Sequence, residues 1–171
     1  MEHRPHADPV PSSCSRPRMF GGELEPVRLP WSWALELLEA AGQYWIATTR
    51  PDGRPHSRPV WGVVVDGRVH FSTGSLAATN LAHRPEITVH AERGTEVVII
   101  EGTARLLEDR ATLERVCARY DAKYCEHLDP DGLPGPFRVV EPHVAFGWLA
   151  SPTFLDGGAV FHGTATRWTF P

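Results

Sequence analysis

The sequence predicts an α+β fold built on an antiparallel β-barrel of six or seven strands with flanking helices. Runs rich in β-branched and aromatic residues are separated by short turn sequences such as Arg50-Pro51-Asp52-Gly53 and Asp66-Gly67, which is typical of a meander. Helical periodicity is confined to one stretch before the strands, one short stretch among them and one after them. No internal repeat is visible.

The first helix is predicted over Trp31–Ala41, where apolar residues recur at spacings of three and four between Pro30 and Gly42. A short helix is predicted over Ser75–His83 and a longer amphipathic one over Arg110–Cys125. The predicted strands are Gln43–Thr49, Pro55–Asp66, Arg68–Thr73, Glu86–Ala91, Glu96–Leu107, Val144–Leu149 and Ala159–Phe170.

The chain has 171 residues, which is the length of one domain with a sizeable core. Residues 1–28 are rich in proline and lack apolar periodicity, so we expect a flexible N-terminal arm followed by a single domain over residues 29–171. A formal net charge of -4 argues against general nucleic-acid binding. Without a membrane-length apolar run or a signal-peptide pattern, we expect a cytoplasmic protein that binds no membrane.

Several kinds of catalytic site are disfavoured by spacing. The three cysteines form no C-x-x-C pair, and the nine histidines show no H-E-x-x-H or other metal-ligand spacing, so we expect no metal site. The G-x-S-x-G, Walker A and G-x-G-x-x-G motifs are absent as well. Hydrolases and classical nucleotide folds are therefore disfavoured.

The run from Phe71 to Ser75 is the strongest candidate for a binding site. A predicted strand ends at Ser72, Thr73 and Gly74, and Ser75 opens the short helix. Free backbone N–H groups and the positive end of the helix dipole favour an anion at such a place.

Arg54, His56 and Arg58 alternate along the strand that follows the first turn, so they share one face of it. Two interpretations remain open. The strip is either a solvated strand edge or a surface that receives phosphate or carboxylate groups, for which arginine is well suited.

Tyr44–Leu107 resembles the FMN-binding split-barrel superfamily, the pyridoxamine 5'-phosphate oxidase-like proteins. The similarity lies in the first strand and turn from Ile46 to Gly53, in the strand Pro59-Val60-Trp61, and in the segment Val69–Ser75 followed by Asn80-Leu81, Arg84-Pro85 and Ile87. The ending Ala165–Phe170 resembles actinobacterial members of the flavin/deazaflavin oxidoreductase group.

The resemblance implies a homodimeric split barrel with cofactor sites at the interface. Members bind FMN, coenzyme F420, occasionally FAD, and in one branch haem, and we expect F420 ahead of FMN here. Three groups of residues would form the site: the ring would lie along Pro59, Val60 and Trp61, the phosphate would contact Ser72, Thr73, Gly74, Ser75, Thr79 and Asn80, and Arg54 and Arg58 would meet the acidic tail. Trp148, Arg167 and Trp168 would come from the second chain or line the substrate side.

One position departs from the family pattern. Many relatives carry Arg and Lys directly after the serine of the phosphate turn, where this chain has Leu76-Ala77-Ala78. The leading hypothesis is an oxidoreductase that transfers hydride between F420 or FMN and a small organic substrate, with no catalytic acid–base pair because the cofactor carries the chemistry. The missing basic pair favours an alternative, a non-catalytic carrier of a flavin or tetrapyrrole. A pyridoxamine 5'-phosphate oxidase-like FMN oxidase is the third hypothesis.

Overall fold

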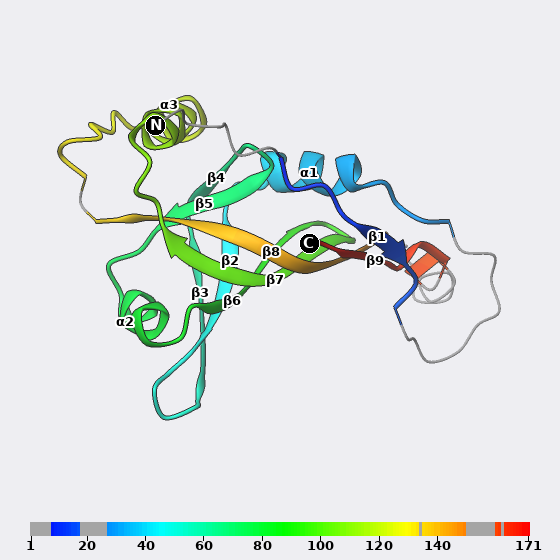
Figure 1. Ribbon diagram of the computed structural model, residues 1–171. Helices are drawn as coiled ribbons and strands as arrows, with labels where there is room; N and C mark the ends of the chain where they lie inside the picture. Colours follow the sequence, from blue (N-terminus) through cyan, green and yellow to red (C-terminus); the bar gives the residue numbers. More distant parts are fainter. Residues whose placement is uncertain (1–7, 18–26, 134, 150–159, 162) are drawn as a thin grey trace.

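The computed structural model describes residues 8–17, 27–133, 135–149, 160–161 and 163–171, which include the helices α1–α3 and nine strands (Figure 1). The helices are α1 Trp31–Ala40, α2 Leu76–His83 and α3 Arg110–Tyr124. The strands are β1 Ser13–Ser15, β2 Tyr44–Thr49, β3 Pro55–Val60, β4 Gly62–Val65, β5 Arg68–Ser72, β6 Glu86–Arg93, β7 Glu96–Leu106, β8 Phe137–Trp148 and β9 Thr166–Thr169.

All strand pairs are antiparallel, and one sheet runs in the order β1-β9-β8-β7-β6-β2-β3. β8 also pairs with β5, which in turn pairs with β4. Because β3 and β4 follow each other in the chain but belong to opposite edges of this sheet, the sheet curls into an open barrel. The predicted α+β fold with an antiparallel split barrel is thereby confirmed.

The predicted strand Pro55–Asp66 is in fact two strands that meet at Trp61. β3 pairs with β2, whereas β4 pairs with β5, so the chain leaves one edge of the sheet and joins the other at this residue. The apolar run that suggested one continuous strand remains buried from Gly62 to Val65, while Trp61 is 52% exposed at the corner.

One additional strand and one longer strand were also not predicted. Ser13–Ser15 lie in the predicted arm but pair with β9, so this part of the arm is a strand that its composition did not predict. β8 begins at Phe137, well before the predicted strand Val144–Leu149.

The predicted last strand is much shorter in the structure. It extends only over Thr166–Thr169, and residues 160, 161, 163 and 164 are helical instead. The Gly157-Gly158 pair before it, which the sequence predicts to be a turn, lies outside the described residues.

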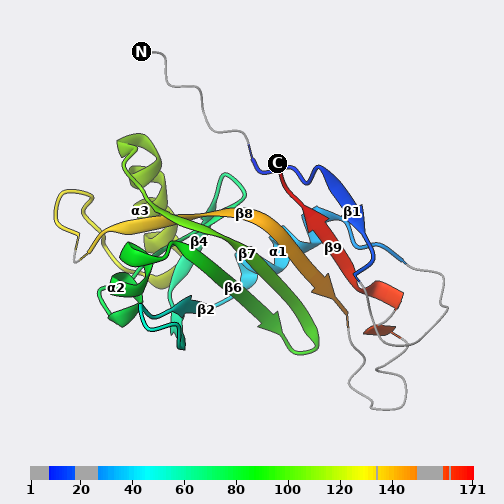
Figure 2. The same cartoon turned by 60° about the horizontal axis from the view of Figure 1, so that its bottom comes forward.

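Two apolar clusters form the core. The larger fills the barrel and is covered by α1, which packs against β4, β6 and β7. The smaller joins Val116 and Tyr120 of α3 to Val63 of β4 and to Phe137 at the start of β8. Figures 1 and 2 show α2 and α3 at one end of the long sheet and β1 and β9 at the other. No helix among the described residues is long and apolar enough to cross a membrane.

Candidate functional site

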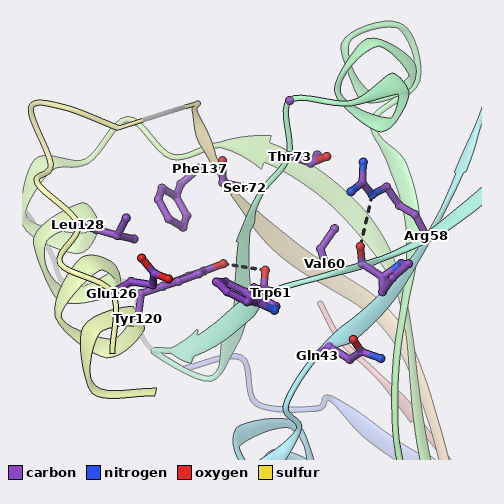
Figure 3. A pocket seen from close by; sticks show the side chains of 12 residues that line it. Gln43, Arg58, Val60, Trp61, Ser72, Thr73, Tyr120, Glu126, Leu128 and Phe137 are labelled. Carbon is purple, nitrogen blue, oxygen red and sulfur yellow. Dashed lines mark hydrogen bonds between the residues drawn. The ribbon is translucent and has the colours of Figure 1, made fainter. Parts of the chain in front are cut away.

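A cleft of about 570 Å³ opens where the chain turns between β3 and β4 (Figure 3). That volume is in the range of pockets that hold cofactor-sized ligands. Its lining comes from the ends of β3 and β5, from α3 and the loop that follows it, from the first residue of β8 and from the residue before β2. The lining residues are Gln43, Arg58, Pro59, Val60, Trp61, Ser72, Thr73, Gly74, Tyr120, Glu126, Leu128 and Phe137.

Side chains of α3 hold the corner at Trp61. The Tyr120 hydroxyl donates to the Trp61 carbonyl oxygen at 2.7 Å, and the Tyr124 hydroxyl accepts from the Gly62 N–H at 3.1 Å. The Trp61 and Tyr124 rings are stacked with centroids 4.8 Å apart and planes 7° from parallel. The corner is thus fixed by tertiary contacts rather than by a turn sequence.

Lys123 adds a third contact from the same helix. Its Nζ donates to the Gly62 carbonyl oxygen at 3.0 Å and lies 5.0 Å from the centroid of the Tyr44 ring. Burial, helped by the positive charge of Arg119, lowers the pKa of Lys123 to about 8, although Glu39 opposes this shift. Because of its hydrogen bond to Gly62, the Lys123 amine is directed at the backbone of β4 and not into the cleft.

Replacing Tyr120 by Phe should lower the free energy of unfolding by about 1 kcal/mol. The substitution keeps the ring, whose centroid lies 5.1 Å from that of Phe137, and removes the hydroxyl, which donates to Trp61 and also interacts with the Ser72 backbone. Urea unfolding followed by circular dichroism measures the change. An unaltered free energy of unfolding would show that this hydrogen bond does not help to hold the corner.

The turn from β5 into α2 forms another wall of the cleft. Ser75 is the N-cap of α2, and its hydroxyl accepts from the Ala77 N–H at 3.2 Å. The Thr73 and Ser75 hydroxyl oxygens lie 2.9 Å apart. The first turn of α2 contains no basic side chain, so hydroxyls and backbone N–H groups are its donors.

The two arginines that were expected to act together are separated. Arg58 lines the cleft, and its Nε donates to the Pro59 carbonyl oxygen at 3.3 Å. Arg54 instead forms a salt bridge with Asp52 at 2.7 Å, and its side chain is 70% exposed. The Asp52 carboxylate in the turn thus pairs with Arg54. Of the two arginines, only Arg58 faces the cleft.

The cleft brings together seven of the predicted site residues: Arg58, Pro59, Val60, Trp61, Ser72, Thr73 and Gly74. The others lie outside its lining. Ser75 is at its edge as the cap of α2, Thr79 is exposed on that helix, and Asn80 is fully buried, where its amide donates to the Thr48 hydroxyl at 2.9 Å.

Trp148 and Arg167 lie on the long sheet away from the cleft of their own chain. Trp148 packs edge-on against Phe161 with centroids 5.2 Å apart. The Arg167 guanidinium lies 5.9 Å from the centroid of the Phe146 ring. Trp168, named with them, is buried in the barrel core.

Five lining residues were not predicted: Gln43, Tyr120, Glu126, Leu128 and Phe137. The sequence placed Tyr120 on the apolar stripe of its helix, and the structure does bury it there. What brings α3 to the cleft is its packing on β4, for which the sequence around these residues carries no local signal.

A second cleft of about 540 Å³ lies at the other end of α3, over β5, β7 and β8. His70 lines it and is 2% exposed, with Nδ1 3.0 Å from the Arg68 carbonyl oxygen. Burial lowers the pKa of His70 from 6.5 to about 4. The imidazole is therefore neutral at pH 7, and Nδ1–H donates to Arg68.

The buried His70 should make stability fall as the pH is lowered from 6.5 to 4. The unfolded chain takes up a proton on this residue near pH 6.5, whereas the native protein resists until about pH 4, so protonation favours unfolding in that window. The lowered pKa values of the Asp52, Asp66 and Asp131 carboxyls also reduce stability as the pH approaches 4, because the unfolded chain takes up protons there first. Comparison with a His70 variant removes this shared contribution. Urea unfolding at several pH values should show a flatter profile for His70→Gln; an identical slope would contradict the assignment.

No group of three or more His, Cys, Asp or Glu side chains in the described part of the chain could hold a metal ion.

Residues 34–149 match the model of the family described as pyridoxamine 5'-phosphate oxidase. Among curated proteins, none matches the sequence. The fold is similar to that of a conserved protein of Mycobacterium tuberculosis, with a TM-score of 0.61 at 22% identity, over 71% of this chain and 85% of that one.

Two other similar solved structures have names that mention a ligand. A heme-binding protein of Mycobacterium smegmatis has a TM-score of 0.59 at 18% identity, and the match covers 71% of this chain and 55% of that one. A pyridoxamine 5'-phosphate oxidase-related, FMN-binding protein of Nostoc punctiforme has a TM-score of 0.52 at 17% identity, over 71% of this chain and 84% of that one. At these identities the similarity establishes the fold.

Proposed function

This chain belongs to the pyridoxamine 5'-phosphate oxidase-like family of split-barrel proteins, and from that premise we propose that its cleft binds a flavin-type cofactor for hydride exchange with a small organic substrate. The observation that carries the proposal is the meeting of the β3 end with the β5–α2 turn across one cleft of cofactor size. When bound, the cofactor supplies the redox chemistry, and the protein supplies binding and orientation.

The phosphate end of the ligand would lie against the β5–α2 turn. The Thr73 and Ser75 hydroxyls are the side-chain donors on that side, and the helix dipole favours negative charge there. The Ala77 and Ala78 N–H groups already donate to Ser75, so the hydroxyls and the dipole carry most of this contact. Arg58 reaches the same cleft from β3 and still has free N–H groups beyond its contact with Pro59. The donor set fits one phosphate, even though α2 lacks the basic pair found in many relatives.

The ring would lie along Val60 and the corner at Trp61. Val60 is buried and supplies an apolar surface, while the exposed Trp61 indole is held in place by its stack on Tyr124. Since the Trp61 carbonyl oxygen is already bonded to Tyr120, the corner presents a preorganised wall. These residues orient the ligand and exclude water; none of them needs to exchange a proton.

The separation of Arg54 from Arg58 favours FMN over coenzyme F420. The sequence suggested that both guanidiniums meet the long acidic tail of F420, but Arg54 is paired with Asp52. A single guanidinium in the cleft matches the single phosphate of FMN better. FMN is therefore the first candidate and F420 the second.

We further propose that two chains associate through the outer face of the barrel. Strand register aligns Pro59, Trp45, His90, Ile99 and Phe146 in one row across β3, β2, β6, β7 and β8. Trp45 and His90 are stacked at 6.4 Å. In Figure 2 no helix crosses in front of β6 and β7.

In a homodimer built on this face, Trp148 and Arg167 would approach the partner's site. Sedimentation analysis of Trp45→Glu against wild type tests the dimer.

Titration of the purified protein with FMN and with F420, followed by intrinsic tryptophan fluorescence, tests the cofactor proposal. Trp61 lies in the cleft, so a ring that binds there should quench its emission strongly. We expect saturable quenching by FMN and weaker binding of F420. Saturation by F420 alone would move the protein to the deazaflavin branch, and the absence of quenching by either would contradict cofactor binding in this cleft.

A non-catalytic carrier is the second candidate, and the observation in its favour is the uncharged first turn of α2. Weak phosphate contacts suit a protein that releases its ligand. Haem is a poorer fit, because the described cleft lining contains no His, Cys or Met to bind iron, and its one tyrosine, Tyr120, donates its hydroxyl to Trp61. Turnover of a substrate by the protein with reduced FMN separates the enzyme from the carrier, which would bind FMN without catalysing its oxidation.

A further inference from the structure

We propose that the part of the cleft next to α3 is a separate subsite that selects a planar organic cation as the substrate, through Glu126. This inference rests on the proposed function, which places the cofactor in the other part of the cleft. Figure 3 shows Tyr120, Glu126, Leu128 and Phe137 on one side of Trp61, and Arg58, Val60 and Thr73 on the other.

The two parts of the cleft carry opposite charges. Arg58 and Glu126 are the only charged side chains among the described residues that line it. An anionic cofactor held near Arg58 leaves the Glu126 part for a second molecule. Because that part is negative, the second molecule should be neutral or positive.

The walls beside Glu126 are aromatic and aliphatic. Tyr120 and Phe137 meet edge to face, with ring planes 77° apart, and Leu128 completes the surface. Burial raises the pKa of the Tyr120 hydroxyl, so this side chain is neutral. Because the hydroxyl donates to the Trp61 carbonyl oxygen, the part of Tyr120 that can contact a ligand is its ring. Flat hydrophobic walls of this kind favour a planar molecule, and aromatic faces also attract a cation.

The Glu126 carboxylate is available to such a ligand. No described residue forms a hydrogen bond or ion pair with it, and Figure 3 shows it beside the Tyr120 ring. The amine of Lys123, which lies in the last turn of α3 three residues before Glu126, is directed at the Gly62 carbonyl oxygen instead. A carboxylate next to aromatic faces recognises an N-alkylated or protonated heteroaromatic ring.

The test is calorimetric titration with two bicyclic probes of similar size, the cation 1-methylquinolinium and the anion 1-naphthoate, at low ionic strength. The wild type should bind the cation more tightly. Glu126→Gln should weaken cation binding by about threefold, the size expected for an exposed charge pair, and Glu126→Lys should reverse the preference. Glu36→Gln, on the exposed face of α1, removes the same charge outside the cleft and should leave both affinities unchanged.

Equal cation affinities in Glu126→Gln and Glu36→Gln would overturn the proposal, as would tight naphthoate binding by the wild type. Each titration is repeated with FMN present. Simultaneous binding of FMN and the cation supports two subsites, and mutual displacement contradicts them. If FMN fails to bind while the cation still depends on Glu126, the cofactor proposal is wrong and the cation site stands.

Discussion

Replacing Ser75 by Asp should weaken FMN binding by a hundredfold or more. The substitution puts a fixed negative charge at the N-cap of α2, where the phosphate would lie. At an effective dielectric constant of ~20, two like unit charges about 4 Å apart repel by roughly 4 kcal/mol, which corresponds to a loss of about a thousandfold and exceeds a hundredfold even if screening removes a quarter of it. Fluorescence titration of the variant with FMN measures it.

Ser75→Asn is the matched control for this experiment. Asn and Asp have almost the same shape and are both good N-caps, so each can accept from the Ala77 N–H as Ser75 does. The helix should therefore fold in both variants, and only the charged one should lose affinity. If Ser75→Asp binds FMN as tightly as Ser75→Asn, the phosphate lies elsewhere.

Replacing Gly62 by Ala should lower the free energy of unfolding by about 2–3 kcal/mol, because the added methyl group overpacks a closed site. A Cβ here would lie 2.8 Å from the His70 carbonyl oxygen and 2.9 Å from the Tyr44 ring. Neither neighbour can yield easily: the first is backbone, and Tyr44 is fully buried with its hydroxyl bonded to Leu38. Urea unfolding gives the change.

Gly42→Ala is the control for the overpacking argument. A Cβ at Gly42 would meet nothing within 4 Å, and its backbone has no positive φ. That substitution should leave the free energy of unfolding unchanged or raise it by at most about 1 kcal/mol. Equal stability of the two variants would show that the corner at Gly62 is looser than the structure indicates.

The sequence predicted those parts of the site that depend on local signals. Ser75 after a strand and before an amphipathic stretch predicted a helix cap, and the structure has one. The break at Trp61 could not be predicted in this way, because the residues around it form an unbroken apolar run. It exists because two edges of one sheet meet there, which is a property of the whole barrel.

Arg54 and Tyr120 illustrate two other reasons for incomplete prediction. Alternation predicted that Arg54 and Arg58 share one strand, but β3 begins at Pro55, so Arg54 lies just before it. Alternation also ignores competing partners, and Asp52 pairs with Arg54 from two residues away. Asp52 was visible in the sequence, so that pairing had a signal. No local sequence signal indicated that Tyr120 lines the cleft, because its contact with Trp61 joins residues 59 positions apart through the packing of α3 on β4.

The most direct test of the account is a crystal structure of the protein with FMN. We expect the ring density along Val60 and Trp61, and the phosphate at the β5–α2 turn within hydrogen-bond distance of Thr73, Ser75 or Arg58. A partner chain across the outer face of β2, β6 and β7 should appear in the same crystal. Density for FMN in the cleft beside His70, or FMN with its phosphate far from the turn, would contradict the assignment.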